Sequence, residues 1–206
     1  MQYRSFELFP EDQSLLSPRE RILAAAHRLF YAEGVRATGV DRIIAEARVT
    51  KVTFYRQFSS KDALILAYLD GRHRLWMQAF EDVIRRHGST LESIVPALQE
   101  WFESAKFRGC AFINVLGELG GTMNPVISRV REHKREVRAL VATLVPRRAD
   151  GELIVQCVSM AMDGAIVQAA WGEPAGALES LRSIIDALTS EKLPVLDNRI
   201  QDVNLL

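Results

Sequence analysis

The chain has 206 residues, 48% of them hydrophobic and 25% charged, a composition that excludes a disordered chain and allows a sizeable core. Its 26 basic and 26 acidic residues cancel, so the net charge alone indicates no particular kind of partner. Two cysteines are too few for a disulfide framework or a zinc site, and no apolar signal-peptide core follows the first residues. We therefore expect a soluble, cytoplasmic protein with one small module plus one larger domain, or a single larger domain.

The N-terminal third contains several recognisable helix starts. Ser17-Pro18-Arg19-Glu20 has the pattern of a capping box with proline at the first helical position. Thr38-Gly39-Val40-Asp41 is a second capping signature, and Thr50 and Ser60 precede two further apolar runs. These starts predict four helices, over about residues 17–33, 40–47, 50–58 and 60–87.

Helical spacing continues through the rest of the chain. Its capping residues predict helices over about 89–104, 124–144, 150–171 and 174–190, and glycines leave room for one short helix within 105–123. The apolar stretch Leu153–Trp171 is interrupted by polar side chains, so we expect a buried helix there and not a membrane span. Residues 1–16 and 191–206 are expected to be tails. No segment predicts a strand, and the fold class is all-α.

Residues 40–58 combine a short helix, a turn of about three residues and a second short helix, which is helix-turn-helix geometry. In such a pair the second helix presents its exposed N-terminal residues to base edges in the major groove. Residues 17–61 carry nine basic and four acidic side chains, a local excess of five positive charges. Because this field attracts a phosphate backbone, the segment is a candidate for binding duplex DNA.

Several longer motifs occur here in a fixed order. Arg19–Ala26 with the following Leu29-Phe30 and Glu33-Gly34 forms one block, Thr38–Ala47 a second, and Lys51–Phe58 with Ser60–Leu64 a third. Together they resemble the DNA-binding domain of TetR (tetracycline-repressor-like) transcriptional regulators, over about residues 18–68. The turn departs from the family pattern, because Arg48 stands where glycine is usual. If the backbone there is left-handed, arginine costs about 1 kcal/mol.

The resemblance implies a helix-turn-helix domain at 17–62 and a ligand-binding and dimerisation domain at 63–190. It implies that Tyr55 and Lys61 hold the DNA backbone, and that Thr38 lies at a helix N-terminus that favours a phosphate. Arg56 is suited to guanine, Gln57 to adenine and Thr53 to a thymine methyl group, whereas Phe58 is expected to be a core aromatic. The predicted DNA-binding residues are Thr38, Arg48, Thr50, Lys51, Val52, Thr53, Tyr55, Arg56, Gln57 and Lys61.

The resemblance also implies a homodimer built from the last two helices. The helix from Asp150 to Trp171 is rich in small side chains, which let helices approach closely, and an ordinary intrachain core is the alternative interpretation. A two-fold dimer would match a palindromic operator. The predicted interface residues are Ala161, Gly164, Ala165, Gln168, Leu181, Ile184, Ile185 and Leu188.

Residues 101–123 are the candidate effector pocket, with aromatic side chains for apolar contact and Asn114 and Glu118 to orient a polar group. Arg108–Asn114, with the later Arg131–Lys134, resembles a regulatory-domain subgroup of the family. Cys110 lies between Arg108 and a possible helix start, which favours a reactive thiol, although a small buried hydrophobe is the alternative. The predicted pocket residues are Trp76, Trp101, Phe102, Phe107, Cys110, Phe112, Asn114, Glu118 and Met123.

The predicted function is a sequence-specific transcriptional regulator, a repressor that a small effector of unknown identity releases from a palindromic operator. A repressor that senses electrophiles or oxidants through Cys110 is the alternative. Two other classes compete: an enzyme and a protein-interaction module with a vestigial helix-turn-helix. The four histidines are scattered, and the sequence shows no Gly-rich phosphate loop, nucleophile elbow or paired carboxylates, so we expect no enzymatic activity, metal or cofactor.

Overall fold

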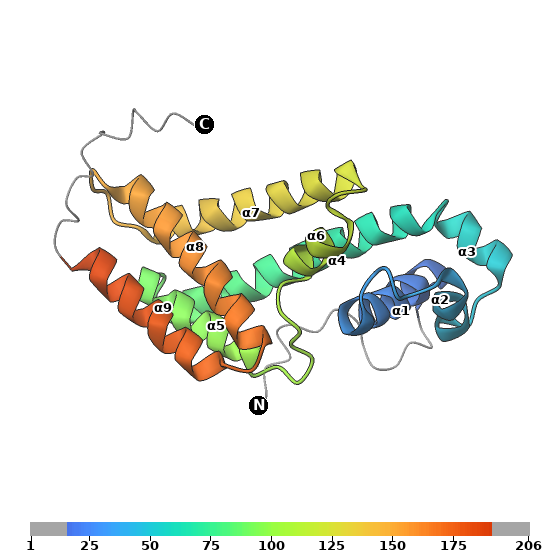
Figure 1. Ribbon diagram of the computed structural model, residues 1–206, viewed down its shortest axis with the longest axis horizontal. Coiled ribbons are helices and arrows are strands. Elements are labelled where there is room, and N and C mark those ends of the chain that lie inside the picture. The colour runs from blue at the N-terminus through green and yellow to red at the C-terminus, as the bar shows by residue number, and fades with distance from the viewer. Residues whose placement is uncertain (1–15, 191–206) are drawn as a thin grey trace, which may run out of the picture.

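The computed structural model describes residues 16–190, and over that range every regular element is a helix (Figure 1). The order of the helices and their bounds agree with the sequence-based prediction to within a few residues. The predicted tails, 1–16 and 191–206, lie outside the described residues except for residue 16. The elements are α1 (Pro18–Glu33), α2 (Val40–Ala47), α3 (Lys51–Gln57), α4 (Lys61–Arg86), the 3-10 helix η1 (Leu91–Ser93), α5 (Ile94–Phe102), α6 (Ala111–Leu119), α7 (Asn124–Leu144), α8 (Gly151–Ala170) and α9 (Pro174–Thr189).

Side-chain caps fix the starts of three N-terminal helices. The Glu20 N–H donates to Ser17 Oγ, and the Ser17 N–H donates to the Glu20 carboxylate at 2.8 Å, so the predicted capping box of α1 is confirmed. Thr50 and Ser60 accept hydrogen bonds from the backbone three residues ahead, at the starts of α3 and α4. Each cap satisfies an N–H group that the helix itself leaves without a partner.

Helices α1, α2 and α3 form a small domain around one apolar core. Ile22, Leu29, Ile43 and Phe54 are fully buried, and Phe58 is 4% exposed, as expected for a core aromatic. Two ion pairs, between Arg28 and Glu46 and between Arg42 and Glu33, add polar contacts between α1 and α2 at the domain surface. Because Phe54 anchors the middle of α3 in this core, the opposite face of the helix is left to solvent.

Helix α4 runs from the end of α3 across the molecule, and the remaining helices pack along its second half (Figure 1). Tyr68 in its second turn makes edge contacts with His27 and Phe30 of α1. Further along, Trp76 stacks on Phe80 at 4.4 Å between ring centroids, in a core shared with α5, α7, α8 and α9. One continuous helix therefore belongs to both parts of the molecule.

Two polar contacts also join the parts directly. The Glu118 carboxylate of α6 accepts hydrogen bonds from the backbone N–H groups of Val35 and Arg36, at 3.1 and 2.8 Å. The Tyr31 hydroxyl at the end of α1 donates to the Gly109 carbonyl at 2.7 Å and accepts from the Arg108 N–H at 3.0 Å. The N-terminal domain is thus held against the loop before α6 and against α6 itself.

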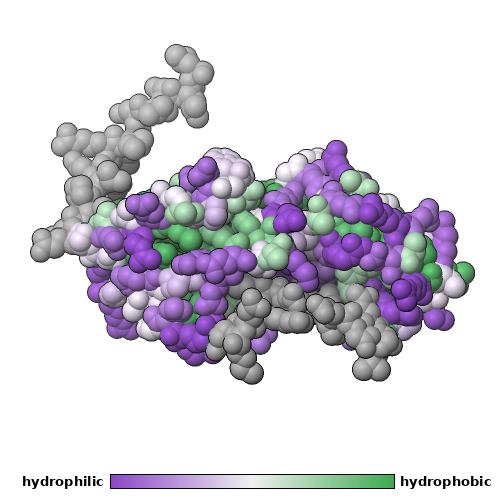
Figure 2. Space-filling view, turned by 90° about the horizontal axis from the view of Figure 1, so that it is seen from below, coloured by the Kyte–Doolittle hydropathy of each residue, from purple (hydrophilic) through white to green (hydrophobic). Residues whose placement is uncertain are grey.

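Helix α8 is the one described helix that is long and apolar enough in composition to cross a membrane, with a mean hydropathy of 1.5. It packs against α7 and α9, and Ile154, Val158 and Met162 on one side of it are buried. It therefore has the contacts of a core helix and is not a clear membrane span. Figure 2 shows that hydrophilic residues cover most of one face of the molecule, with smaller hydrophobic patches between them.

Candidate DNA-binding surface and effector cavity

The turn between α2 and α3 has the geometry of a helix-turn-helix. Residues 48–50 join the two helices, and Arg48 closes α2 in a left-handed conformation, with φ 51° and ψ 49°. The Arg48 N–H donates to the Ala45 carbonyl and the Val49 N–H to the Ile44 carbonyl, both at 3.2 Å. The backbone therefore has the conformation for which glycine is usual, and arginine adopts it at a cost of about 1 kcal/mol.

One face of α3 is exposed and carries most of the predicted DNA contacts. Val52 is 78% exposed and Tyr55 47%, although both side chains are large and partly apolar. Lys51 and Arg56 are also exposed, whereas Thr53 and Gln57, like Lys61 at the start of α4, are half-buried. An exposed valine and tyrosine next to two cations on a seven-residue helix fit a surface that is covered when a duplex binds.

The positively charged side chains of this surface are available to bind phosphates. Within residues 16–190 no carboxylate pairs with Arg48 or Arg56, and Lys51 has only a distant partner in Asp41, at 3.9 Å. Partial burial lowers the pKa of Lys61 from its ordinary value, while the carboxylates of Glu118 and Asp62 oppose that shift. Glu46 of α2 and Glu33 of α1 pair instead with Arg28 and Arg42.

The side chain of Thr38, a residue expected at a phosphate-favouring helix start, is turned into the N-terminal domain. Thr38 is fully buried, and its hydroxyl donates to the Gly34 carbonyl at 2.7 Å, while Gly39 takes the capping position of α2. The side chain stabilises the loop between α1 and α2. The first N–H groups of α2 still lack intrahelical partners, as at any helix start.

A cavity lies in the larger, C-terminal part of the molecule, between α4, α5, α6, α7 and α8. The volume not occupied by protein atoms is about 390 Å³, part of it open to solvent. Only about 20 Å³ of this volume can be reached by the centre of a water-sized sphere, so the cavity as it stands holds little more than a water molecule. A larger molecule enters only if side chains move apart. The lining residues are Arg72, Trp76, Trp101, Cys110, Ala111, Phe112, His133, Lys134, Val137, Met162, Asp163 and Ile166.

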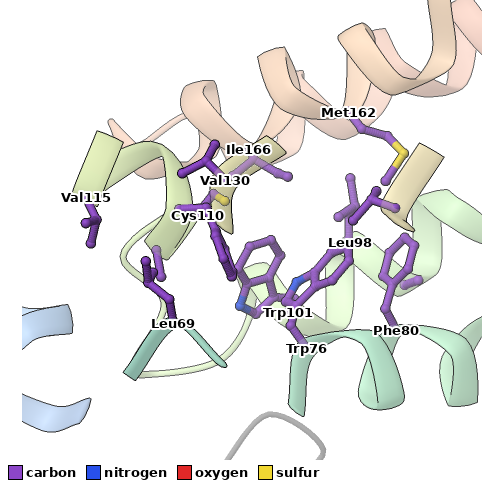
Figure 3. Packing of buried hydrophobic residues seen from close by; sticks show 14 of the residues in the cluster. Leu69, Trp76, Phe80, Leu98, Trp101, Cys110, Val115, Val130, Met162 and Ile166 are labelled. Carbon is purple, nitrogen blue, oxygen red and sulfur yellow. The ribbon is translucent and has the colours of Figure 1, made fainter. Parts of the chain in front are cut away.

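Four predicted pocket residues, Trp76, Trp101, Cys110 and Phe112, line this cavity, and Figure 3 shows the first three grouped with Met162 and Ile166. The other five predicted pocket residues do not line this cavity. Phe102 and Phe107 pack on each other behind Trp101, at 4.9 Å between centroids. The Asn114 amide donates to the Arg108 carbonyl, Glu118 binds the backbone of the N-terminal domain, and Met123 precedes α7.

Sequence reasoning missed eight of the twelve residues of the cavity wall, all but one of them on α4, α7 and α8. The eight are Arg72, Ala111, His133, Lys134, Val137, Met162, Asp163 and Ile166. The stretch Arg131–Lys134, which shares a subgroup pattern with the loop before α6, contained a signal for two of them. Nothing in local spacing indicates that residues sixty positions apart face one space.

The polar groups of the cavity are mostly donors and cations. His133 is 4% exposed, stacks on Phe112 at 3.8 Å and has its Nδ1 3.0 Å from that of His73. Burial, aided by nearby Lys134 and other positive groups, lowers the pKa of His133 to about 3, so the ring is neutral at physiological pH. The Trp76 indole N–H is buried without a hydrogen-bond partner among residues 16–190, which costs about 1–3 kcal/mol.

Helices α8 and α9 present a second exposed apolar surface, here called the α8–α9 face. Met160 and Val167 on α8 are 68% and 40% exposed, Trp171 directly after the helix is 68% exposed, and the three share one side with Gly164. A Cβ added at Gly164 would meet nothing within 4 Å, so the subunit itself does not require glycine there. Ile184 continues the face on α9, at 40% exposure.

The predicted dimer residues are divided by this geometry. Ala165, Leu181, Ile185 and Leu188 are at most 8% exposed and belong to the subunit's own core, so their assignment to an interface is wrong. Leu181, Ile185 and Leu188 point inward because α9 packs against α5 as well as α8. Gly164 and Ile184 are exposed, and Ala161 and Gln168 half-buried, on or beside the α8–α9 face.

A positively charged helix-turn-helix on a long helix that leads to a cavity-containing bundle defines a helical, DNA-binding transcriptional regulator. The family model for bacterial regulatory proteins of the tetR family matches residues 22–68. The crystal structure of SCO4454, a TetR-family regulator from Streptomyces coelicolor, is 33% identical, covers 83% of this chain and 93% of its own, and has a TM-score of 0.72. The chain belongs to the TetR family.

Curated relatives agree at lower similarity. A helix-turn-helix regulator of Lactococcus lactis is 29% identical over 53% of this chain, which spans little more than half, 58%, of that relative. The repressor NemR of Escherichia coli is 21% identical over 74% of this chain and 79% of its own length. The structure of NemR in its reduced form has the same fold, with a TM-score of 0.71 and 20% identity over 83% of this chain and 96% of its own.

Proposed function

We propose that the protein is a homodimeric repressor that binds a palindromic operator through α3 and leaves it when a small molecule enters the cavity beside Trp76. The observation that carries the proposal is the exposure of α3, where Val52, Tyr55 and Arg56 face solvent, and Val52 and Tyr55 are the only large hydrophobic residues exposed within residues 17–61. No intrachain packing accounts for a 78% exposed valine there.

The α8–α9 face supports the dimer. It combines exposed Met160, Val167 and Trp171 with a glycine that leaves space for a close helix approach. Two such faces related by a two-fold axis bury the same residues on both subunits. A dimer of this kind holds two copies of α3, which must lie about 34 Å apart to enter successive major grooves on one side of the duplex.

Helix α4 supports the coupling between cavity and DNA. Arg72 and Trp76 line the cavity, and Arg72 is eleven residues from the start of α4, about 16 Å along the axis. An effector that requires a wider cavity favours a conformation in which the two copies of α3 no longer match the grooves. To change occupancy from nearly full to nearly empty, it must prefer that conformation by about 5.5 kcal/mol.

The test is binding of the purified protein to duplexes from its own upstream region. Repression predicts one protected, two-fold symmetric site, and affinity that falls steeply with salt because bound phosphates release counterions. Binding without sequence preference, or a monomer at the concentrations that bind, contradicts the proposal.

A thiol-sensing repressor is the second candidate, because Cys110 lines the cavity and caps α6. The thiol is only 5% exposed, so an oxidant or electrophile must enter the cavity to reach it. Cys110→Ser separates the two candidates: full induction in cells by the native signal excludes thiol chemistry, and loss of induction with intact operator binding supports it. Cys157→Ser is the matched control.

A further inference from the structure

We propose that the effector is a small aromatic carboxylic acid, bound as its anion, with its ring among the aromatic walls of the cavity and its carboxylate on Arg72 and the Trp76 indole N–H. The inference rests on the proposed function for the cavity's role, and it adds the chemical class of the ligand and the residues that select it.

The walls favour a flat, apolar ring. Trp76 and Trp101 cross edge to face at 5.5 Å between centroids, and Phe112 and His133 form a second, stacked pair. Met162 of α8 lines the same cavity as the two indoles. A thioether side chain adapts its shape more readily than a branched one, so Met162 is the wall that can give way as a ring enters the narrow centre.

The charges favour an anion. Among the charged side chains that line the cavity, Lys134 and Asp163 pair with each other. Arg72 has no carboxylate partner within residues 16–190, and its guanidinium carbon lies 4.0 Å from the centroid of the Tyr31 ring. The cavity therefore has one uncompensated positive charge, and a cationic ligand would be repelled. A guanidinium binds a carboxylate through two parallel hydrogen bonds.

The Trp76 indole N–H, which has no partner among residues 16–190, favours a ligand that carries a hydrogen-bond acceptor next to it. Trp76 is 6% exposed, lines the cavity, and has an indole N–H with no hydrogen-bond partner in residues 16–190. Arg72 and Trp76 are four residues apart on α4, so they lie on the same side of the helix. A carboxylate can accept from both at once, whereas a neutral hydrocarbon leaves the N–H unsatisfied.

The same contact reaches the DNA-binding domain. Arg72 rests on the Tyr31 ring, and the Tyr31 hydroxyl is bound to the backbone of Arg108 and Gly109, next to Cys110 in the cavity wall. A ligand carboxylate that draws the Arg72 guanidinium into the cavity breaks its contact with the ring of Tyr31, at the end of α1. Ligand charge and the position of the N-terminal domain are then linked through one side chain.

The experiment compares matched ligands on the full chain. Benzoate and cinnamate are titrated against benzamide and cinnamamide, and against cyclohexanecarboxylate, with tryptophan fluorescence and calorimetry as readouts of the dissociation constant. We expect at least one aromatic acid to bind at least tenfold more tightly than its amide and than the non-aromatic acid. Equal affinity for acid and amide, an equal or better non-aromatic acid, or no aromatic acid bound at 1 mM overturns the inference.

Variants assign the selectivity to residues. Arg72→Gln should abolish the preference for acid over amide, Arg72→Lys should retain it at reduced affinity, and Trp76→Phe should weaken the acid severalfold with little effect on ring binding. Arg74→Gln, an exposed cation on the same helix, is the control and should change neither. An Arg72→Gln protein that is folded by circular dichroism and keeps the acid preference contradicts the assignment.

Operator binding is measured separately, without ligand, so the two proposals fail in different ways. If the protein binds aromatic acids selectively but binds no operator sequence specifically, the proposed repressor function is contradicted and the proposed ligand class is supported. If the protein binds an operator specifically but shows no preference for acids, the proposed ligand class is contradicted and the proposed repressor function is supported.

Discussion

Arg48 and Thr38 illustrate how much single side chains in the N-terminal domain depend on backbone geometry. The sequence indicated that arginine at position 48 takes a left-handed conformation if the family's turn is kept, and the backbone has φ 51° there. It did not indicate that the hydroxyl of Thr38 is turned inward to the Gly34 carbonyl, because a helix-cap signature does not specify which of two neighbours takes the cap. Local pattern predicts the turn, while packing decides which side chains remain available for DNA.

Replacing Arg48 by glycine should stabilise the protein. Glycine adopts a positive φ without steric cost, so Arg48→Gly should raise the free energy of unfolding by about 1 kcal/mol relative to Arg48→Ala. Both variants lose the same cation, which makes Arg48→Ala the matched control for DNA affinity. Urea denaturation measures the difference, and equal stability of the two variants would show that the turn relaxes to another conformation.

Arg56 and Lys61 should contribute differently to DNA binding. Arg56→Ala, on the exposed face of α3, should cost about 1–3 kcal/mol on the operator and relax its sequence preference. Lys61→Ala should weaken operator and random duplex alike, and should reduce the salt slope by about one unit per subunit. Titrations on both duplexes at several salt concentrations distinguish the roles, and an equal loss on both for Arg56→Ala removes it from base recognition.

At the level of elements, the sequence predicts where each helix begins and ends, but not which helices pack against one another. Capping residues and glycines mark the ends of α1, α3, α4 and α8 in the sequence because these signals act within a few residues. Which side of α9 faces the core depends on α5, which lies some eighty residues earlier in the chain. Three apolar residues of α9 that were assigned to a dimer interface are therefore buried inside the subunit. For the same reason, only four of the twelve residues that line the cavity were predicted.

A charge in the centre of the α8–α9 face should disrupt the dimer. Val167→Lys places an ammonium group where we propose that a second α8 packs, while in the single subunit the side chain is already 40% exposed. We expect a shift from dimer to monomer in sedimentation, at least tenfold weaker operator binding, and an unchanged helical content. Ala139→Lys on an exposed position of α7 is the control. A Val167→Lys protein that remains dimeric places the interface elsewhere.

Across the whole molecule, two buried histidines join distant parts of the core and make stability depend on pH. His27 contacts Tyr68 in the N-terminal domain, and His133 stacks on Phe112 in the cavity wall. Burial, with nearby positive side chains, lowers the pKa of each to about 3, from an ordinary value of 6.5. Both rings are therefore neutral in the folded protein over the range in which the unfolded chain takes up protons.

Stability should fall as the pH is lowered below 6.5. Between pH 6.5 and 3 the unfolded state binds up to two more protons at these sites, so the free energy of unfolding decreases by up to about 2.7 kcal/mol per pH unit. Urea titrations at pH 7.5, 6.0 and 5.0 measure the slope. His27→Gln should reduce it, whereas His87→Gln, at an exposed position, should not. A stability that is constant from pH 7.5 to 5 would contradict the burial of both rings.

The central claim is that α3 lies in a duplex groove, and the most direct measurement is footprinting of the protein on a site selected from its source genome. The account predicts protection of two half-sites about one helical turn apart, which Val52→Glu abolishes while the variant remains folded and dimeric. Specific protection that survives Val52→Glu and Arg56→Ala together would contradict the claim, because another surface would then bind the DNA.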